Sequence, residues 1–374
     1  MLSFIAEKAK EDAPALVRRD GQTMTFGTLA MASAAVMQVV GERVGDPARR
    51  IVGVAVEDTA GFVASVLAVL EAGAVAMPLD LRRGTAALER EAAAARALAV
   101  IVGDAAEDRL DVVAIDASRR ELGGEACLIV DAGLRKAVHS RAGLGVAVDA
   151  IAREDGLDAA SRLAMVGSLA SVTGLTTALA TLRAGGAILD HGAAGANVAA
   201  GSMAELLAIA GMPLPRVVLV GDGDVAALAR AFPGAKIARA YDTGEALRVA
   251  GDAAVRGDGW IEVGPTTMLG YLDDAEATRA ALVEREGRRL VHAQPPERIA
   301  PEALERWIAS TPGVREAVVL AIRDAAGERL HAFVAGDATL VPRHPARVAV
   351  LESLPHGADG AVDRQALRRM ASVD

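Results

Sequence analysis

The chain has 374 residues, a formal net charge of −9, and a composition that is 52% hydrophobic but only 2% aromatic. This length allows two domains, and the scarcity of aromatic residues predicts cores built from many Ala, Val and Leu side chains. Acidic residues are spread along the chain without clusters of Lys and Arg, which argues against a nucleic-acid partner and favours a cytoplasmic protein.

The first 120 residues alternate between helical and strand patterns. Apolar residues recur at helical spacing in Leu29–Val40, and Gly61–Glu71 is apolar almost all round, which predicts a buried helix. Short apolar runs typical of strands occupy Ile51–Val56, Ala74–Met77 and Leu98–Val102. This alternation with short connections predicts βαβ units and a mostly parallel sheet.

The middle of the chain continues the same alternation. Continuous apolar runs predict central parallel strands at Ala126–Val130, Ala187–Leu189, Val217–Val220 and Ile237–Tyr241. Open α/β sheets bind ligands outside the carboxyl ends of their strands. The turns that follow the first, third and fourth of these strands are therefore the candidate positions for a site.

Membrane and export segments are not expected. The uncharged run Leu163–Leu182 spans 20 residues, which is long enough to cross a membrane. Its many Gly, Ser and Thr residues favour a buried helix over a membrane span. The segment Met1–Lys10 has early charges and no long apolar core, so it does not fit a signal peptide.

The pattern changes at about Pro295. Pro301–Ser310 fits an amphipathic helix with Pro at its start, and Ala317–Ile322 and Leu330–Val334 fit strands. We therefore expect an α/β protein whose large N-terminal domain, residues 1–294, has mostly parallel sheets with flanking helices. A small C-terminal α+β domain is expected to follow in residues 295–374.

Generic catalytic motifs are absent from the sequence. It has no Gly-x-Gly-x-x-Gly after a strand, no Walker-type phosphate loop and no Gly-x-Ser-x-Gly elbow. The single cysteine, Cys127, lies in an apolar run, which favours a buried, unreactive thiol over a nucleophile. The six histidines show no metal-ligand spacing.

Four stretches, in order, resemble the AMP-forming adenylate-ligase superfamily of acyl-CoA synthetases, aryl-acid ligases and adenylation domains. Thr25–Leu29 is similar to the early Thr-Tyr-x-x-Leu segment, and Phe62–Asp80 to a helix and strand that end in Pro-Leu-Asp. Val263–Thr278 (VGPTTMLGYLDDAEAT) resembles the Gly-Pro and Gly-Tyr segment, and Ile299–Val314 resembles the start of the family's C-terminal domain. The resemblance implies an enzyme in which a carboxylate attacks the α-phosphate of Mg-ATP, and a thiol then displaces AMP.

The resemblance also implies the positions of site residues. Glu245 would be catalytic as a Mg²⁺ ligand, and Lys136 would be the remaining cation at the phosphates. Ser171 and Gly174 fall in the segment that lines the acyl pocket. The positions that correspond to the ATP or AMP site are Gly221, Asp222, Gly223, Tyr241, Asp242 and Gly244.

Several catalytic positions depart from the family pattern. The Ser- and Gly-rich phosphate loop is nearly deleted between Leu128 and Leu144, and the Thr that contacts phosphate is Gly244. Without that loop, backbone amides cannot surround the β- and γ-phosphates. The lysine that bridges carboxylate and phosphate during adenylation is replaced by Ala361.

Other departures affect the acyl pocket, the ribose and the hinge. The aromatic and His pair of the acyl pocket becomes Ala170 and Ser171. No Asp stands in the ribose position within residues 290–294, and the hinge between domains is cut out near residues 295–298. A family member without this hinge could not rotate between its two half-reactions.

The sequence leaves more than one function open. One is a degenerate ligase that no longer adenylates and is retained to bind a nucleotide, a carboxylic acid or acyl group, or a protein. A carrier protein, a ligase subunit or a second copy forming a homodimer are the candidate protein partners. The alternative is an active AMP-forming acid ligase with a minimised site, in which Glu245, Tyr241 and Lys136 hold Mg²⁺, adenine and phosphate.

Two further hypotheses concern single residues. Arg135, Lys136 and His292 are the side chains that could take vacated positions. Acyl transfer without ATP is a third function, but Ser171, Cys127 and His139 fit structural roles better than a nucleophile–base pair.

Overall fold

The chain divides into two compact units in the computed structural model. One comprises Met1–Leu81, Ala86–Ala254 and Ile261–Val291, and the other comprises Arg82–Thr85, Val255–Trp260 and His292–Asp374. The structure describes residues 3–10, 12–18, 21–104, 109–115, 120–132, 135–190, 195–220, 224–241, 244–247, 249–250, 260–262, 264–285, 288–292, 301, 305, 308–309, 311, 313–324, 327–337, 346–357 and 362–371.

The first unit contains an eight-stranded sheet with the order β14-β13-β12-β11-β9-β10-β1-β2. The six central strands are parallel, and β14 and β2 are antiparallel at the edges. The strands are β1 (Pro14–Val17), β2 (Thr23–Thr25), β9 (Arg162–Met165), β10 (Ala187–Leu189), β11 (Val198–Gly201), β12 (Arg216–Val220), β13 (Lys236–Tyr241) and β14 (Val249–Ala250).

The second sheet of this unit has seven strands in the order β16-β8-β7-β4-β3-β5-β6. Strands β7, β4, β3 and β5 are parallel, whereas β6, β8 and β16 are antiparallel to their neighbours. The strands are β3 (Ile51–Val56), β4 (Val75–Pro78), β5 (Ala99–Asp104), β6 (Arg109–Ala114), β7 (Ala126–Ala132), β8 (Arg135–Ser140) and β16 (Gly270–Tyr271).

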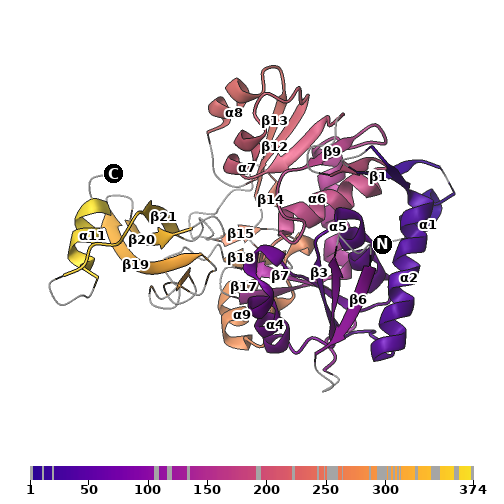
Figure 1. Ribbon diagram of the computed structural model, residues 1–374, viewed down its shortest axis with the longest axis horizontal. Coiled ribbons are helices and arrows are strands. Elements are labelled where there is room, and N and C mark those ends of the chain that lie inside the picture. The colour runs from indigo at the N-terminus through magenta and orange to yellow at the C-terminus, as the bar shows by residue number, and fades with distance from the viewer. Residues whose placement is uncertain are drawn as a thin grey trace. The chain divides into compact units, whose positions relative to one another are not determined.

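Four helices pack between the two sheets (Figure 1). They are α2 (Phe26–Val44), α3 (Thr59–Glu71), α5 (Arg141–Glu154) and α6 (Val172–Arg183), and their apolar side chains join both sheets in one core. Residues that precede the helices fix where they begin, because Asp58, Ser140 and Ser171 each accept a hydrogen bond from a backbone amide of the first turn.

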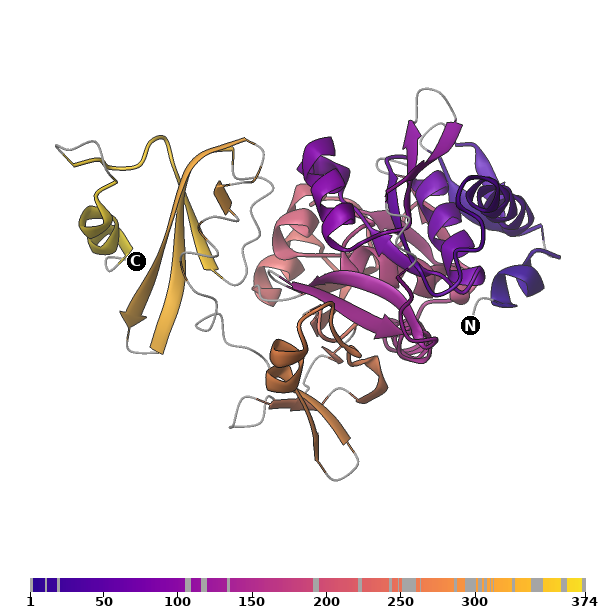
Figure 2. The same cartoon turned by 90° about the horizontal axis from the view of Figure 1, so that it is seen from below.

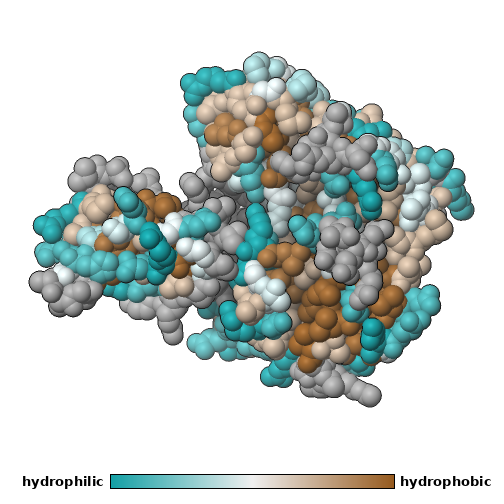
Figure 3. All heavy atoms as spheres, viewed as in Figure 1, coloured by the Kyte–Doolittle hydropathy of each residue, from teal (hydrophilic) through white to brown (hydrophobic). Residues whose placement is uncertain are grey.

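Shorter helices cover the outer faces of the two sheets. Helix α4 (Thr85–Ala94) packs on the second sheet, and α7 (Met203–Ala208) and α8 (Val225–Ala231) pack on the first. Figure 3 shows apolar side chains gathered near β3 and β6, and Val113 of β6 is 46% exposed. Helix α4 therefore covers only part of the outer face of the second sheet.

Several short helices and strands lie outside the two large sheets. Strands β17 (Leu282–Arg285) and β18 (Arg288–His292) form an antiparallel hairpin in a three-stranded sheet with β15 (Trp260–Glu262). Helix α9 (Ala275–Ala281) follows β16, and two 3-10 helices, η1 (Leu81–Arg83) and η2 (Gly264–Thr266), connect strands. Helix α1 (Ser3–Lys8) lies at the N-terminus (Figure 1).

The second unit is built on a three-stranded sheet (Figure 2). Strands β19 (Val314–Asp324) and β20 (Gly327–Gly336) are antiparallel, and β21 (Ala346–Leu351) runs parallel to β20. Helix α11 (Arg364–Ala371) buries Leu367 against one face of this sheet, and Ile308 packs on the other.

The predicted α/β class, with mostly parallel sheets, flanking helices and a smaller α+β part, is confirmed. The run 163–182 is a correction, because it does not form one helix. It contains the end of strand β9, a turn and most of helix α6, since Ser171 caps a new helix at Val172. No helix among the described residues is long and apolar enough to cross a membrane.

Candidate functional site

The hairpin of β7 and β8 stands where the phosphate loop was expected, and it holds Lys136. In the hairpin register Asp131 lies opposite Lys136, and Ala132 lies opposite Arg135. The Lys136 ammonium group forms ion pairs with Glu91 of α4 and with Asp131, the latter at 2.6 Å. Lys136 is therefore neutralised by two carboxylates of its own chain.

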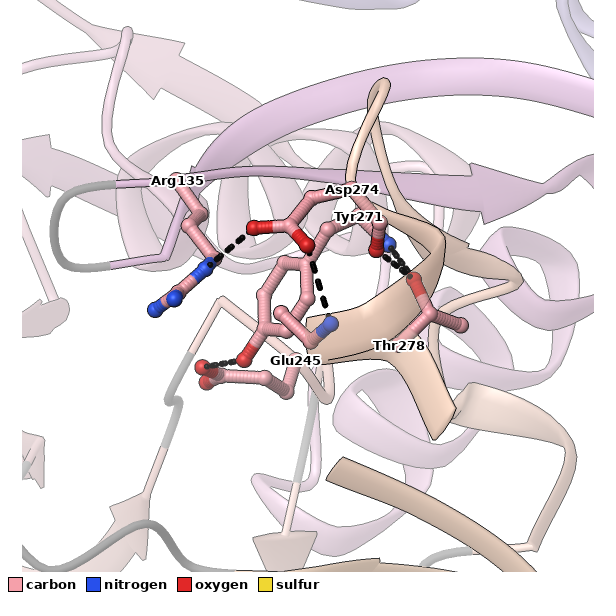
Figure 4. Close-up of polar contacts among 6 residues, drawn as sticks. Arg135, Glu245, Tyr271, Asp274 and Thr278 are labelled. Carbon is pink, nitrogen blue, oxygen red and sulfur yellow. Dashed lines mark hydrogen bonds and ion pairs between the residues drawn. The ribbon is translucent and has the colours of Figure 1, made fainter. Parts of the chain in front are cut away.

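Arg135 begins strand β8 and faces α9. Its Nε donates a hydrogen bond of 2.9 Å to Asp274 Oδ2, and its guanidinium group lies 5.4 Å from the centre of the Tyr271 ring (Figure 4). Asp274 also caps α9 by accepting from the Ala277 amide at 2.9 Å. This backbone hydrogen bond, together with Arg135, lowers the pKa of the Asp274 carboxyl.

Tyr271 connects Arg135 to Glu245. Its hydroxyl donates to Glu245 Oε1 at 2.7 Å (Figure 4). Burial raises the pKa of the Tyr271 phenol, and the charge of Glu245 raises it further. Its backbone amide donates to Thr278 Oγ1 at 2.8 Å, so both ends of the residue are fixed. The carboxylate predicted to bind Mg²⁺ is thus hydrogen-bonded to a tyrosine of the same unit.

Gly244 packs directly against the tip of strand β7. Its φ is +74°, and a Cβ at this position would overlap the Asp131 carbonyl oxygen and lie 2.7 Å from the Ala132 Cα. Glycine tolerates this backbone conformation without the steric cost that other residues incur. A threonine side chain, expected here from the family pattern, has no room.

His139 of β8 fixes the same turn from the other side. Its Nε2 donates to the Gly244 carbonyl oxygen at 2.6 Å, because a carbonyl can only accept. The imidazole is fully buried, and burial lowers its pKa to about 4 despite this hydrogen bond. The ring is therefore neutral at pH 7, and it joins β8 to the residue before Glu245.

Ser171 and Gly174, predicted to line an acyl pocket, form the first turn of α6. Ser171 Oγ accepts from the Gly174 amide at 2.9 Å and donates to the Ser168 carbonyl at 2.7 Å. A Cβ on Gly174 would overlap that same carbonyl oxygen. Helix capping explains both residue types, and a contact with substrate remains a prediction.

The structure brings some predicted site residues together and leaves others undescribed. Tyr241 ends β13, whose residue Ala240 pairs with Val220 at the end of β12. His292 ends β18. The predicted residues Gly221, Asp222, Gly223 and Asp242, together with Gly133 and Ala361, lie outside the described residues.

Metal binding at Glu245 remains a prediction. Within the described ranges, no group of three or more His, Cys, Asp or Glu side chains is arranged to hold a metal ion. Four carboxylates lie around the hairpin: Glu91 and Asp131 pair with Lys136, Asp274 pairs with Arg135, and Glu245 accepts the Tyr271 hydroxyl. A polyphosphate bound here would have to approach these carboxylates, which is unfavourable.

Sequence reasoning missed Glu91, Tyr271 and Asp274 as members of this arrangement. Glu91 is 45 residues from Lys136, so no local pattern joins them. Tyr271 and Asp274 lie in the quoted stretch VGPTTMLGYLDDAEAT, which carried the resemblance but was interpreted as scaffold. The signal that could have found Asp274 was its place before Ala275–Ala281, where Asp is a favoured helix cap.

Residues 4–143 match the family described as AMP-binding enzyme. None of the curated protein sequences is significantly similar to the chain.

Solved structures are similar over nearly the whole chain. ATP-bound MatB from Rhodopseudomonas palustris has a TM-score of 0.65 and 16% identity, with 99% of this chain and 98% of that chain covered. The o-succinylbenzoate CoA synthetase MenE from Bacillus subtilis, a double mutant bound to a product analogue, has a TM-score of 0.64 and 14% identity, with 98% of each chain covered. The amide bond synthetase McbA from Marinactinospora thermotolerans has a TM-score of 0.63 and 20% identity, with 99% of each covered.

At these identities the solved structures establish the fold, and the family match covers residues 4–143. The match of residues 4–143 to the AMP-binding enzyme family and the fold shared over nearly the whole chain agree with the resemblance predicted from the sequence.

Proposed function

We propose that the chain is a degenerate AMP-forming acid ligase that does not adenylate and is retained to bind a carboxylic acid or acyl group, or a protein partner such as a carrier protein. The observation that carries this proposal is the packing of the β7–β8 hairpin against Gly244. In the family pattern a threonine at this position contacts phosphate. Here, backbone atoms of Asp131 and Ala132 occupy the space of that side chain.

The charges around the hairpin support the same function. Adenylation requires cations and amide donors fixed where negative charge develops on the phosphates. Lys136 is the cation expected there, and its side chain is only 20% exposed and paired with Glu91 and Asp131. Releasing Lys136 to a phosphate would break its ion pair with Glu91, whose side chain is only 10% exposed, and breaking a buried ion pair is costly.

The hydrogen bonding of the Glu245 carboxylate gives a third argument. A Mg²⁺ ligand must present carboxylate oxygens to the ion, which Mg²⁺ binds in near-octahedral geometry. One oxygen of Glu245 accepts the Tyr271 hydroxyl, and the Glu245 carbonyl accepts the Met268 amide at 2.8 Å. Binding of Mg²⁺ through that oxygen would have to displace a phenol that has a buried position and a raised pKa.

An assay of ATP–pyrophosphate exchange tests the proposal. The full chain, Mg-ATP, labelled pyrophosphate and a panel of short, long and aromatic carboxylic acids would be incubated beside an active AMP-forming ligase. We expect exchange no faster than in the absence of protein. Exchange with any acid, lost in Glu245→Ala, would overturn the proposal.

Calorimetry with ATP and with AMP, each with and without Mg²⁺, provides a test that does not depend on the choice of acid. We expect no Mg²⁺-dependent ATP binding at millimolar concentration.

The alternative function is an active ligase with a minimised site. One observation favours it: Glu245 and the end of β13 keep their expected positions in the chain order of the fold. It predicts Mg²⁺-dependent ATP binding that Glu245→Ala removes.

A further inference from the structure

The Arg135 guanidinium group has one occupied edge and one open edge. Nε is bonded to Asp274, whereas Nη1 and Nη2 make no hydrogen bond to any residue that the structure describes. In Figure 4 these two nitrogens point away from Asp274 and Tyr271. The side chain is 39% exposed, so the open edge can be reached from solvent.

The open edge is held in place by three contacts. Asp274 fixes Nε, and Asp274 is itself fixed by the amide of Ala277 at the start of α9. The guanidinium carbon lies 5.4 Å from the centre of the Tyr271 ring, and the hydroxyl of that ring donates a hydrogen bond to Glu245. A guanidinium group fixed in this way loses little conformational freedom when it binds a ligand.

The open edge favours a small anion with one negative charge. Two N–H groups side by side match the two oxygens of a carboxylate or of a phosphate. The Asp274 carboxylate beside Arg135 repels a polyphosphate more strongly than it repels a single negative charge. Lys136 offers no second cation, because Glu91 and Asp131 already pair with it.

We propose that Arg135 is an anion receptor that binds one carboxylate or one phosphate group of a ligand through Nη1 and Nη2. This inference deepens the proposed function and rests on it, since it identifies the group by which a non-adenylating chain would hold an acid. A carboxylic acid and inorganic phosphate share this chemistry and are separated by the test.

The test is calorimetric titration of the full chain at low ionic strength with benzoate and, separately, with inorganic phosphate. Arg135→Gln removes the receptor. Arg153→Gln is the matched control, because Arg153 is an exposed arginine at the end of α5 whose nearest carboxylate, Glu154, is 3.9 Å away. We expect at least about tenfold weaker binding in Arg135→Gln, and unchanged binding in the control.

A second variant keeps the test valid if Arg135→Gln folds poorly. Asp274→Asn retains a favoured capping residue and a hydrogen-bond acceptor for Arg135, and removes one negative charge beside the receptor. We expect it to bind benzoate more tightly. Unchanged binding in Arg135→Gln, weaker binding in Asp274→Asn, or no binding of either anion to the unaltered chain would overturn the inference.

The titration can succeed or fail independently of the pyrophosphate-exchange assay that tests the proposed function. Arg135-dependent benzoate binding together with pyrophosphate exchange would leave the receptor standing and reject the proposed loss of adenylation. Absence of both would reject the receptor alone. Binding of phosphate but not benzoate through Arg135 would support the receptor and identify its ligand as a phosphate group.

Discussion

At the scale of single residues, the polar groups of the candidate site form hydrogen bonds and ion pairs with one another. Tyr271 binds Glu245, Asp274 binds Arg135, and His139 binds the Gly244 carbonyl. Cys127 is fully buried as its apolar run predicted, and burial raises its pKa to about 12, so it is an unreactive thiol at pH 7.

His139 should make the stability of the fold depend on pH. Its pKa is lowered from 6.5 to about 4 in the folded chain, so its contribution is complete above pH 6.5 and is lost as the pH falls towards 4. For these values we expect the free energy of unfolding to drop by about 2 kcal/mol between pH 7 and pH 5. Urea unfolding at both pH values measures this change.

The control for this prediction is His139→Gln, which keeps an amide donor near Gly244 but cannot titrate. Burial raises the pKa of Glu71, which therefore stabilises the fold as the pH falls and opposes the effect of His139 in both proteins. Between pH 7 and pH 5, the free energy of unfolding should fall by about 2 kcal/mol more in the unaltered chain than in His139→Gln. Equal losses would show that His139 is not neutral and buried in solution.

These residue contacts were the part of the site that the sequence could not predict. The resemblance pointed to Lys136, Glu245 and Gly244, but the residues that contact them are distant in sequence. Gly244 could be recognised as a substituted threonine, whereas its close approach to Asp131 depends on how the hairpin packs. A single sequence contains no signal for such a contact.

At the scale of elements, strand patterns predicted the sheets well because buried parallel strands form continuous apolar runs. Ala187–Leu189 was predicted at its observed bounds, and Ala126–Val130 is extended only to Ala132. The run 163–182 was misinterpreted because uncharged turn residues, such as Ser168 and Ser171, do not interrupt an apolar pattern. Its division into strand, turn and helix depends on the Ser171 cap.

The packing of the β7–β8 hairpin on the turn at Gly244 makes a prediction for stability. Gly234 has a similar φ of +80° but no atom within 4 Å of its potential Cβ, so Gly234→Ala measures the backbone cost alone. We expect the free energy of unfolding to fall by about 1 kcal/mol in Gly234→Ala. We expect it to fall by about 3 kcal/mol in Gly244→Ala, because the added methyl group must also displace the hairpin. Urea unfolding of both variants measures the difference, and equal losses would mean that the hairpin does not pack on Gly244.

At the scale of the whole molecule, the chain combines a family fold with a proposed loss of family chemistry. The fold follows from long apolar patterns that run through both units, which is why it could be predicted. The chemistry depends on a few positions, and Ala361 is one that only the resemblance identifies.

Restoring that one position should not restore adenylation. Ala361→Lys returns the charge expected to bridge carboxylate and phosphate, but leaves Lys136 paired and Gly244 covered. We expect no pyrophosphate exchange from this variant with the same panel of acids. Exchange after this single substitution would show that the phosphate side of the site is open, contrary to the proposed function.

The β7–β8 hairpin also limits which changes in the amino-acid sequence could restore a phosphate loop. From Leu128 onward its strands pair without a register shift up to Ala132 and Arg135, and the sequence has two residues between these. Amino-acid substitutions alter side chains but cannot lengthen a connection, so a phosphate loop could return only through an insertion that also lifts the hairpin from Gly244. If the proposed function holds, amino-acid substitutions alone would leave this chain with functions that do not need that loop.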